Sequence, residues 1–170
     1  MIIARLVSGQ VQSNSSEAFS LFEKSCFGEK DQDVIVYMPV EALFLMKQKK
    51  LSIEKNKKIL SYDQAFSALK KVDSRLSVRL PVFNDLRKKG FMLKTGLKFG
   101  GDFRIYDKGT RPSTAHARWV LVCEKDSDKI NWSEFSSKNR VAHSTHKKVI
   151  FALVDQENNP NYYEMSWLRF

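Results

Sequence analysis

Residues 139–155 read NRVAHSTHKKVIFALVD, and the later part of this stretch, VIFALV, is apolar at every position. An uninterrupted apolar run of this length predicts a central strand covered on both faces, whereas a half-exposed strand alternates apolar with polar residues. Two histidines, an arginine and a pair of lysines stand just before the run. These charges would suit a solvated helix end or a nonspecific phosphate patch, but they would also suit a site at the mouth of a buried strand.

The segments around this strand predict a mixed sheet with a helix on either face. Further strands are expected in FMLKTG, DFRIYDKG, HARWVLVCEKD and YYEMSWLRF. One helix is expected around SSKNRVAHS and another over RLPVFNDLRKKG, with Pro81 near its first turn and Gly90 just after its end. The second half of the chain is therefore predicted to be an α/β layer.

The first half of the chain predicts a smaller mixed unit. Strands are expected in IIARLVSGQV, in LSIE and in DVIVYMP, which Pro39 ends. Helices are expected over SEAFSLFEKSCFG, VEALFLMKQKK and SYDQAFSALKKV; Ser15 or Ser16 would cap the first, Gly28 would end it, and Ser61 would begin the third. We therefore expect an α+β protein with two domains: residues 1–79, a small mixed α/β domain, and residues 80–170, an α/β domain with a central mixed sheet flanked by helices.

The chain is strongly basic. It has 170 residues, with 29 Lys and Arg against 19 Asp and Glu, so its formal net charge is +10. The excess is +4 in residues 1–79, with 13 basic and 9 acidic residues, and +6 in the remainder, with 16 and 10. A spread of this kind favours a polyanionic partner bound by a folded surface over a polybasic membrane anchor.

The two cysteines and the hydropathy of the chain bear on its compartment. Cys26 and Cys123 lie far apart and lack metal-ligand spacing, which is typical of buried thiols in a reducing compartment. The N-terminal apolar stretch is too short for a signal peptide, and no segment approaches the roughly 20 apolar residues that cross a bilayer. We expect a soluble cytoplasmic protein without a membrane partner.

Residues 93–109, LKTGLKFGGDFRIYDKG, hold four of the seven glycines, together with Arg104 and three lysines. The spacing matches neither a P-loop nor a dinucleotide-binding fingerprint, and a loop and hairpin with glycine turns would explain it. Tyr106 ends the strand DFRIY, and His116 is expected to open the strand HARWVLV across a turn that contains Gly109. Lys147 stands at the N-terminal edge of the apolar strand, so the three side chains could meet at one end of the sheet.

Tyr106, His116 and Lys147 would together suit the cleavage of RNA. A phenolate-like tyrosine can take the proton of a ribose 2′-hydroxyl, an imidazolium can protonate the leaving 5′-oxygen, and an ammonium can stabilise the charge that develops on the phosphate. Because free tyrosine titrates near pH 10, the base would need cationic neighbours, for which Lys147, Lys148 and Arg104 are candidates. Each residue also has a plainer interpretation, as packing for the tyrosine and as a solvated turn residue for the histidine.

The chain resembles the archaeal tRNA-splicing endonuclease family. The resemblance is carried by GFMLKTGLKFGGDFRIYDKG, HARWVLV and RVAHSTHKKVIFALVD, and in the first half by FGEK, VEALFLMKQKKLSI and SYDQAF. It covers nearly the whole chain and implies a nuclease-like second domain. It further implies that Tyr106 is the general base, His116 the general acid and Lys147 the transition-state stabiliser; the family's usual HS at the start of that strand is HA here.

The resemblance also implies residues that bind RNA. Arg140, seven residues before Lys147, is similar to an arginine that stacks on an extruded bulge base, and Trp167 would be its partner from the last strand. Trp167 would equally suit packing at a subunit contact. Lys148 and Arg104 complete the basic residues that we assign to RNA.

A metal site is not expected. His143 and His146 have a spacing that could bind metal on a helix, but no cysteine or carboxylate cluster completes the site, so we interpret His143 as structural and His146 as exposed. Asp102 and Asp107 flank the tyrosine strand without the E-x-K arrangement of metal-dependent nucleases. We therefore expect catalysis without a cofactor.

The resemblance implies a substrate and an assembly. The substrate would be precursor tRNA, cut in a bulge–helix–bulge fold to leave a 2′,3′-cyclic phosphate and a 5′-hydroxyl. The loop at residues 155–161 and the final strand would support a homotetramer or dimer of dimers, or pairing with a second subunit type. The alternatives are a noncatalytic RNA-binding subunit of such an assembly and a metal-dependent DNA nuclease or resolvase on a related sheet.

Overall fold

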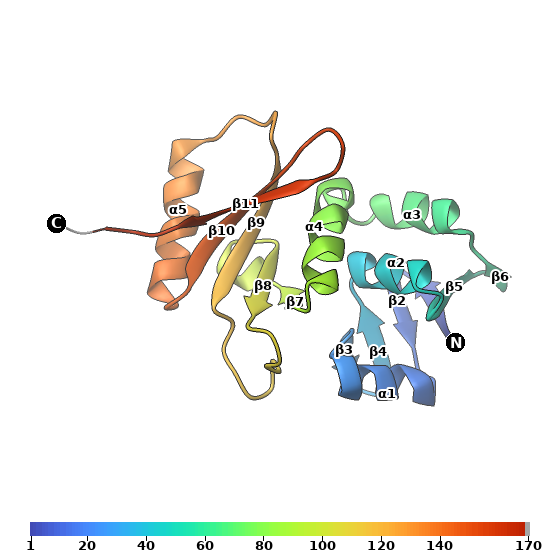
Figure 1. Cartoon of the computed structure of the whole chain (residues 1–170). Coiled ribbons are helices and arrows are strands. Elements are labelled where there is room, and N and C mark those ends of the chain that lie inside the picture. The colour runs from blue at the N-terminus through green and yellow to red at the C-terminus, as the bar shows by residue number, and fades with distance from the viewer. Residues whose placement is uncertain (169–170) are drawn as a thin grey trace. The chain divides into compact units, whose positions relative to one another are not determined.

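The computed structural model describes residues 1–168, and the chain divides into two compact units, Met1–Leu80 and a second that begins at Pro81. Each unit has its own mixed sheet with helices, so the predicted fold class is confirmed (Figure 1). The division lies one residue later than the boundary expected from the change in sequence pattern.

The first unit is built on a six-stranded sheet in the order β3-β4-β2-β1-β5-β6. Its strands are β1 (Ile2–Val7), β2 (Gln10–Ser13), β3 (Glu29–Asp31), β4 (Val34–Tyr37), β5 (Leu51–Lys55) and β6 (Lys58–Ile59). The β1–β5 pair is parallel, and the other pairs are antiparallel. The expected single strand over residues 2–11 is wrong, because Ser8 and Gly9 adopt positive φ and turn the chain into a hairpin.

Three helices accompany this sheet: α1 (Ser16–Ser25), α2 (Pro39–Lys47) and α3 (Tyr62–Lys70). Ser15, one of the two expected caps of α1, is confirmed, and Ser61, where the third helix was expected to begin, is the N-cap of α3; each side chain accepts a hydrogen bond from a backbone N–H of its helix. The predicted end of α1 at Gly28 is wrong. Cys26 takes the left-handed position that closes α1, and it is half-buried instead of fully buried.

The second unit is built on a five-stranded sheet in the order β11-β10-β9-β8-β7. Its strands are β7 (Met92–Thr95), β8 (Phe103–Tyr106), β9 (Trp119–Lys125), β10 (Lys148–Val154) and β11 (Pro160–Met165). Strands β9 and β10 are parallel, and all other neighbours are antiparallel. The VIFALV run lies inside β10, which has strands on both sides and buried residues on both faces, as predicted.

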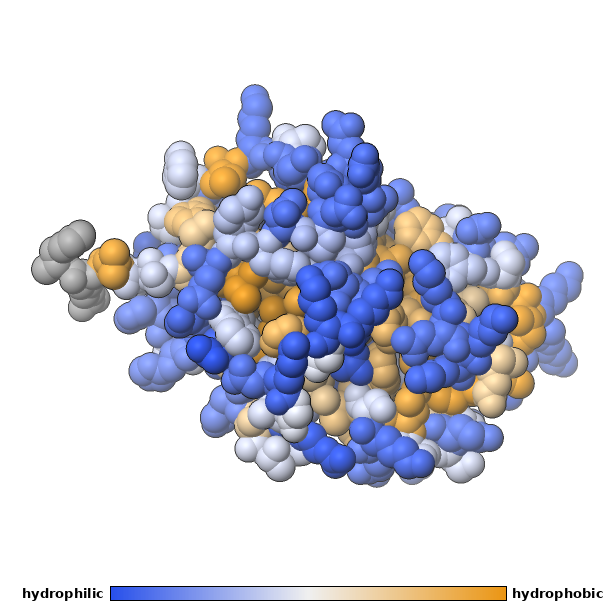
Figure 2. Space-filling view, viewed as in Figure 1, coloured by the Kyte–Doolittle hydropathy of each residue, from blue (hydrophilic) through white to orange (hydrophobic). Residues whose placement is uncertain are grey.

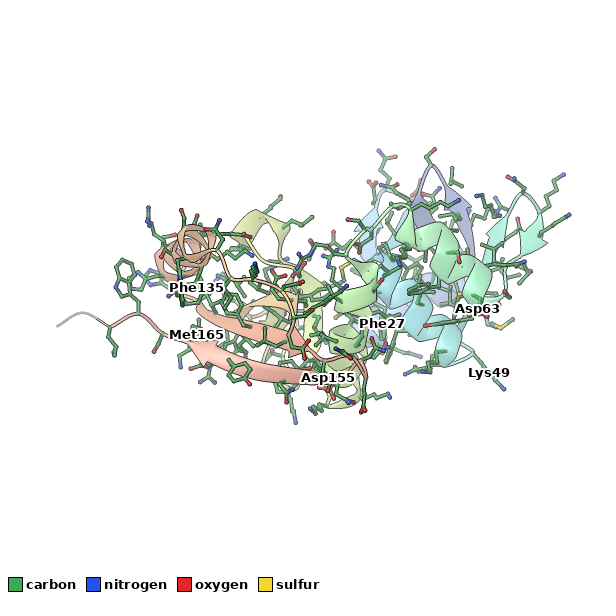
Figure 3. All side chains as sticks on the ribbon, turned by 90° about the horizontal axis from the view of Figure 1, so that it is seen from above. Phe27, Lys49, Asp63, Phe135, Asp155 and Met165 are labelled. Atoms are coloured by element: carbon green, nitrogen blue, oxygen red, sulfur yellow. The ribbon has the colours of Figure 1, made fainter. Side chains whose placement is uncertain are left out.

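A helix covers each face of this sheet (Figure 1). On one face, α5 (Trp132–Ser144) packs over a cluster of Val120, Val122, Val149 and Phe151. Phe135 of α5 and Met165 of β11, both labelled in Figure 3, pack against this cluster. On the other face, the ring of Phe83 in α4 (Leu76–Lys88) lies 5.8 Å from the ring of Phe103.

Helix α4 differs from its sequence prediction. It begins at Leu76, so Pro81 lies inside the helix and not in the first turn. The carboxylate of Asp73 accepts the N–H of Arg75 at 3.0 Å just before the helix, which favours the early start. Buried apolar residues on both sides of the proline offset the hydrogen bond that it cannot donate.

The face of the molecule drawn in Figure 2 is predominantly polar. In Figure 2, hydrophilic side chains cover most of the face in view, with smaller apolar areas between them. Within residues 1–168, no helix combines the length and the apolar character that a bilayer crossing requires.

Candidate active site

Three neighbouring inner strands of the second sheet have one end each on the same side of the sheet. We call this row of strand ends the sheet edge, as distinct from an edge strand. Strand β8 ends at Tyr106, β9 begins at Trp119, and β10 begins at Lys148. The register pairs Trp119 with Ile105 on one side and with Lys148 on the other, so these ends are aligned. Because adjacent strands lie ~4.8 Å apart, the three ends span on the order of 10 Å, a width that long side chains can bridge.

Tyr106 and His116 differ in their access to solvent at this edge. Tyr106 is only 2% exposed, whereas His116 is exposed. His116 does not open a strand as predicted, because β8 has ended and leaves residues 116–118 without a ladder; it lies in the loop of residues 107–118. Two residues later, the N–H of Arg118 donates to the carbonyl of Ile105 at 3.0 Å, which returns the loop to the end of β8.

The end of helix α5 positions Lys147. The backbone N–H of Lys147 donates to the carbonyl of Ala142 at 2.8 Å, and that of His146 donates to the carbonyl of His143 at 3.1 Å. This pair of bonds is the Schellman motif, in which the residue at the left-handed position is usually glycine. Here it is His146, with φ 54. The Nζ atom of Lys147 donates to the carbonyl of Thr145 at 3.0 Å, a favourable place for a cation at a helix C-terminus.

The ring of Phe99 contacts two cations near the sheet edge, Lys147 and Arg104. The ring of Phe99, in the short 3-10 helix η1 (Leu97–Phe99), lies 4.8 Å from the Nζ atom of Lys147 and 5.2 Å from the guanidinium carbon of Arg104. The same guanidinium carbon lies 5.9 Å from the centroid of the Tyr106 ring. Arg104 thus stands between the tyrosine and the ring that Lys147 contacts. Sequence analysis missed Phe99, whose role depends on long-range contacts.

The glycines around η1 have a structural reason. A Cβ at Gly96 would lie 2.7 to 2.8 Å from backbone atoms of Phe103, and one at Gly101 would lie 2.4 Å from the side chain of Val120. Only glycine allows the backbone to approach so closely. The glycine-rich segment therefore places Phe99 beside Arg104, and packing explains Gly96 and Gly101.

Lys148 has a different environment from Lys147. Its Nζ atom is 2.6 Å from a carboxylate oxygen of Glu164 on β11, and the indole N–H of Trp119 donates to the same carboxylate at 2.8 Å. The hydrogen bond from Lys148, and then that from Trp119, hold the pKa of Glu164 below its usual range. Successive strand residues face opposite sides, and Val149 packs under α5, so Lys148 points to the other face. Sequence analysis missed Glu164, because the strand register was needed to find it.

The two residues proposed to clamp a base lie near the end of α5. Arg140 is exposed on α5, one helical turn before His143. The ring of Trp167 lies 4.8 Å from the ring of His143, in an edge-on arrangement. Trp167 is not in the last strand as predicted, because β11 ends at Met165.

The carboxylates of this region have structural partners. Asp102 is buried and accepts the backbone N–H of Cys123 at 2.8 Å. Asp107 lies 3.6 Å from the guanidinium of Arg118. Within residues 1–168, no three side chains of His, Cys, Asp or Glu lie where they could jointly hold a metal ion.

Comparison with known families covers both units. The profile described as "tRNA intron endonuclease, catalytic C-terminal domain" matches residues 76–162. The profile described as "tRNA intron endonuclease, N-terminal domain" matches residues 2–66. Together they cover most of the chain, and the first includes the positions of Tyr106, His116 and Lys147.

Relatives named tRNA-splicing endonuclease agree with these profiles. The chain is 31% identical over 169 residues to the tRNA-splicing endonuclease of Methanococcus maripaludis, which covers 99% of this chain and 95% of the relative. It is 34% identical over 155 residues to that of Methanothermobacter thermautotrophicus, with 91% and 90% covered. It is 37% identical over 134 residues to that of Nanoarchaeum equitans, with 75% and 86% covered. From the two profile matches and the near full-length similarity to these enzymes, it follows that the chain belongs to the tRNA intron endonuclease family.

Proposed function

We propose that this chain is an RNA endonuclease that cleaves precursor tRNA at intron boundaries within a bulge–helix–bulge fold. The main support is the meeting of β8, β9 and β10 at one edge, inside the segment that matches the catalytic domain of the family. There Lys147 and Arg104 contact one phenylalanine ring, and Arg104 also contacts the ring of Tyr106. A tyrosine and two cations linked by ring contacts support the proposal, and His116 lies in the loop that returns to the end of β8.

In the proposed reaction, the phenolic oxygen of Tyr106 takes the proton of the ribose 2′-hydroxyl. The 2′-oxygen attacks the adjacent phosphorus, and the bond from phosphorus to the 5′-oxygen breaks. His116 donates a proton to the leaving 5′-oxygen. The products are a 2′,3′-cyclic phosphate and a 5′-hydroxyl, and the chemistry needs no cofactor.

Lys147 would stabilise the charge that develops on the non-bridging phosphate oxygens. Its ammonium is placed by two features of its own segment, the Schellman motif and the hydrogen bond to Thr145. A cation held in place before the reaction stabilises the transition state without reorganising, which is typically the largest electrostatic contribution in such sites. Arg104, on the same ring, would add positive charge beside the phosphate.

RNA binding would rest mainly on shape and phosphate contacts, because A-form RNA hides its base edges in a deep groove. Arg140 and Trp167 are our candidates for holding a splayed bulge nucleotide, at ~1–3 kcal/mol per stacked base. The support for this assignment is that Arg140 lies on α5 one helical turn before His143, and that the ring of Trp167 contacts the ring of His143. Lys148 would contribute positive charge on the opposite face.

We further propose that the chain works in the cytoplasm as a homotetramer or dimer of dimers, or together with a second subunit type. Strand β11 lies at the edge of its sheet and could pair with another chain. The loop of residues 155–161 is ordered by Asp155, whose carboxylate accepts the N–H groups of Glu157 and Asn159. An ordered acidic loop is suited to docking on a basic surface.

Cleavage of precursor tRNA in the presence of EDTA tests this function, with the His116→Ala variant beside the wild type. We expect the wild type to cut at both intron boundaries. The variant should lose on the order of 10²-fold or more in rate while retaining RNA binding, because only the proton donor is removed. Light scattering of the same sample would show whether one chain type is sufficient.

Other outcomes would point elsewhere. Cleavage that is unchanged in the variant would contradict the role of His116. Binding without cleavage by the wild type would indicate a noncatalytic subunit. Cutting of a DNA junction only when metal is added would indicate a metal-dependent nuclease.

A further inference from the structure

Two hairpins of the first unit have the same type of two-residue turn but different residues in it. The β1–β2 turn holds Ser8 at φ 48 and Gly9 at φ 83, and the β5–β6 turn holds Asn56 at φ 51 and Lys57 at φ 62. A two-residue turn with both φ values positive is type I′, which prefers glycine at its second position. Glycine stands there in the first hairpin, but a lysine stands there in the second, although a side chain at this φ is strained.

The second hairpin carries another local disadvantage. Lys55 and Lys58, which flank the turn, are directly opposite each other in the strand register. Like charges in this arrangement repel and destabilise the pair. Among residues 1–168, no carboxylate forms an ion pair with Lys55, Lys57 or Lys58. The tip of the β5–β6 hairpin therefore carries three exposed lysines, although the turn favours glycine at position 57 and the opposed pair Lys55 and Lys58 repel each other.

Protection of a sheet edge explains only part of this pattern. Strand β6 is an edge strand, and lysine on an edge discourages pairing with other chains. This accounts for Lys58. It does not account for Lys57, which lies in the turn, or for Lys55, which belongs to the inner strand β5. Departures from local rules that bring no contact within the fold are typical of functional positions.

A hollow of about 740 Å³ lies beside this hairpin. Its walls come from the β1–β2 turn, β5 and α3, and Figure 1 shows the chain running from β6 directly into α3. Its polar lining consists of Ser8, Lys55, Asp63, Gln64, Ser67 and Lys71. Asp63, labelled in Figure 3, is the only carboxylate among the lining residues. Hydroxyl, amide and ammonium donors thus line one concave surface next to the cationic tip.

We propose that the tip lysines Lys55, Lys57 and Lys58, together with this hollow, bind the phosphodiester backbone of the RNA substrate. This inference rests on the proposed function, because RNA is the polyanion on which the sheet edge would act. Lysine is suited to this role as a mobile point charge, and amide and hydroxyl donors commonly bind phosphate and sugar oxygens. The contacts would hold the RNA without reading its sequence.

Affinity for precursor tRNA, measured over a range of salt concentrations, tests the proposal. All proteins carry His116→Ala so that the RNA stays intact. We expect Lys55→Gln/Lys57→Gln/Lys58→Gln to bind about 10-fold more weakly near 0.1 M salt, with the slope of log affinity against log salt reduced by roughly 2 to 3. The matched control is Lys24→Gln/Lys30→Gln/Lys47→Gln, which removes the same charge elsewhere in the first unit and should bind like the parent.

A second variant separates binding from folding. Lys57→Gly places the preferred residue in the turn, so the melting temperature should rise by about 2–4 °C while RNA affinity falls. Gln32→Gly is the control, because Gln32 has a comparable positive φ, 50, in the turn of residues 32–33 between β3 and β4, which contains no lysine or arginine. It should raise stability without changing affinity.

The outcomes distinguish this inference from the function on which it rests. If wild-type protein cuts precursor tRNA and both lysine variants bind it like the parent, the RNA site at the tip is wrong and the endonuclease assignment stands. If both triple variants weaken binding equally, the effect is one of net charge, and the tip is not a site. If wild-type protein neither binds nor cuts the RNA, the proposed function itself fails.

Discussion

Lys147 places its Nζ atom 4.8 Å from the centroid of the Phe99 ring, so an ammonium at the end of α5 contacts a ring from the glycine-rich loop. Arg104 lies 5.2 Å from the same ring. Replacing Phe99 with Leu keeps an apolar side chain but removes the π face from both cations, each contact being worth ~0.5–1 kcal/mol. We expect the cleavage rate at saturating RNA to fall about 5- to 30-fold, because 1.4 kcal/mol corresponds to tenfold in rate.

The control for this change is Phe19→Leu. The Nζ atom of Lys30 lies 5.8 Å from the centroid of the Phe19 ring in the first unit. The control variant therefore removes the same kind of cation–π contact away from the sheet edge. Single-turnover cleavage should be unaffected by the control. An equal loss of rate in both variants would show that Phe99 matters only through general stability.

The two adjacent lysines should differ in function. Lys147→Ala removes the proposed transition-state stabiliser and should lower the cleavage rate by on the order of 10²-fold. Lys148→Ala breaks an exposed ion pair with Glu164 and should cost less than about 1 kcal/mol of stability and little cleavage rate. Parallel rate and urea-unfolding measurements compare them. A larger rate loss in Lys148→Ala would show that the wrong lysine has been assigned.

Stability should depend on pH through Glu164. Because Lys148 and then Trp119 lower the pKa of Glu164 in the folded protein, this carboxylate stabilises the fold above its unfolded pKa of about 4.3. That stabilisation is lost as pH falls through the lower, folded pKa. Glu164→Gln should therefore reduce the free energy of unfolding by less than about 1 kcal/mol at pH 7, with a shrinking difference below pH 4.

Urea unfolding at several pH values measures this difference. Glu23→Gln is the control, since Glu23 is exposed and has no ion pair within residues 1–168. A constant deficit of Glu164→Gln down to the lowest accessible pH would mean that the carboxylate acts through packing and not through its charge.

The glycine-rich segment should be sensitive at one position for a steric reason. At Gly96, an added Cβ would lie 2.7 to 2.8 Å from the backbone of Phe103, which cannot move without disturbing β8. At Gly109, no atom lies within 4 Å of an added Cβ. The only cost of alanine there is the conformational strain of a side chain at φ +78. We expect Gly96→Ala to cost about 2–3 kcal/mol of unfolding free energy and Gly109→Ala about 1 kcal/mol. Equal costs would argue against close packing of this loop.

The fold was predictable where local signals determine it. Ser15 and Ser61 cap helices because each hydroxyl reaches a backbone N–H within its own turn, and the apolar run of β10 requires cover on both faces. The errors occurred where tertiary contacts override local preference. Pro81 is accommodated inside α4, which packs Phe83 against Phe103, although proline favours a first turn.

The site was predictable as a set of strand ends but not as a set of contacts. Tyr106 and Lys147 stand next to apolar runs, so their place at a sheet edge follows from the sequence pattern. The role of Phe99 and the carboxylate of Glu164 depend on loop packing and on the register of β10 with β11, which no single segment encodes. His116 was misplaced in a strand because a strand needs a partner, and β8 ends before reaching it.

Replacing His146 in the Schellman motif before Lys147 should increase the stability of the fold. His146 holds φ 54, a left-handed position that costs a non-glycine residue about 1 kcal/mol, and its N–H donates to the carbonyl of His143. His146→Gly should therefore raise the free energy of unfolding by about 1 kcal/mol, while both backbone bonds that place Lys147 remain. Asn158→Gly is the control: Asn158 has φ 64, but asparagine tolerates this region, so its gain should be a few tenths of a kcal/mol. Thermal unfolding compares the two, and a gain at position 146 no greater than at 158 would mean that the imidazole offsets its strain through contacts of its own.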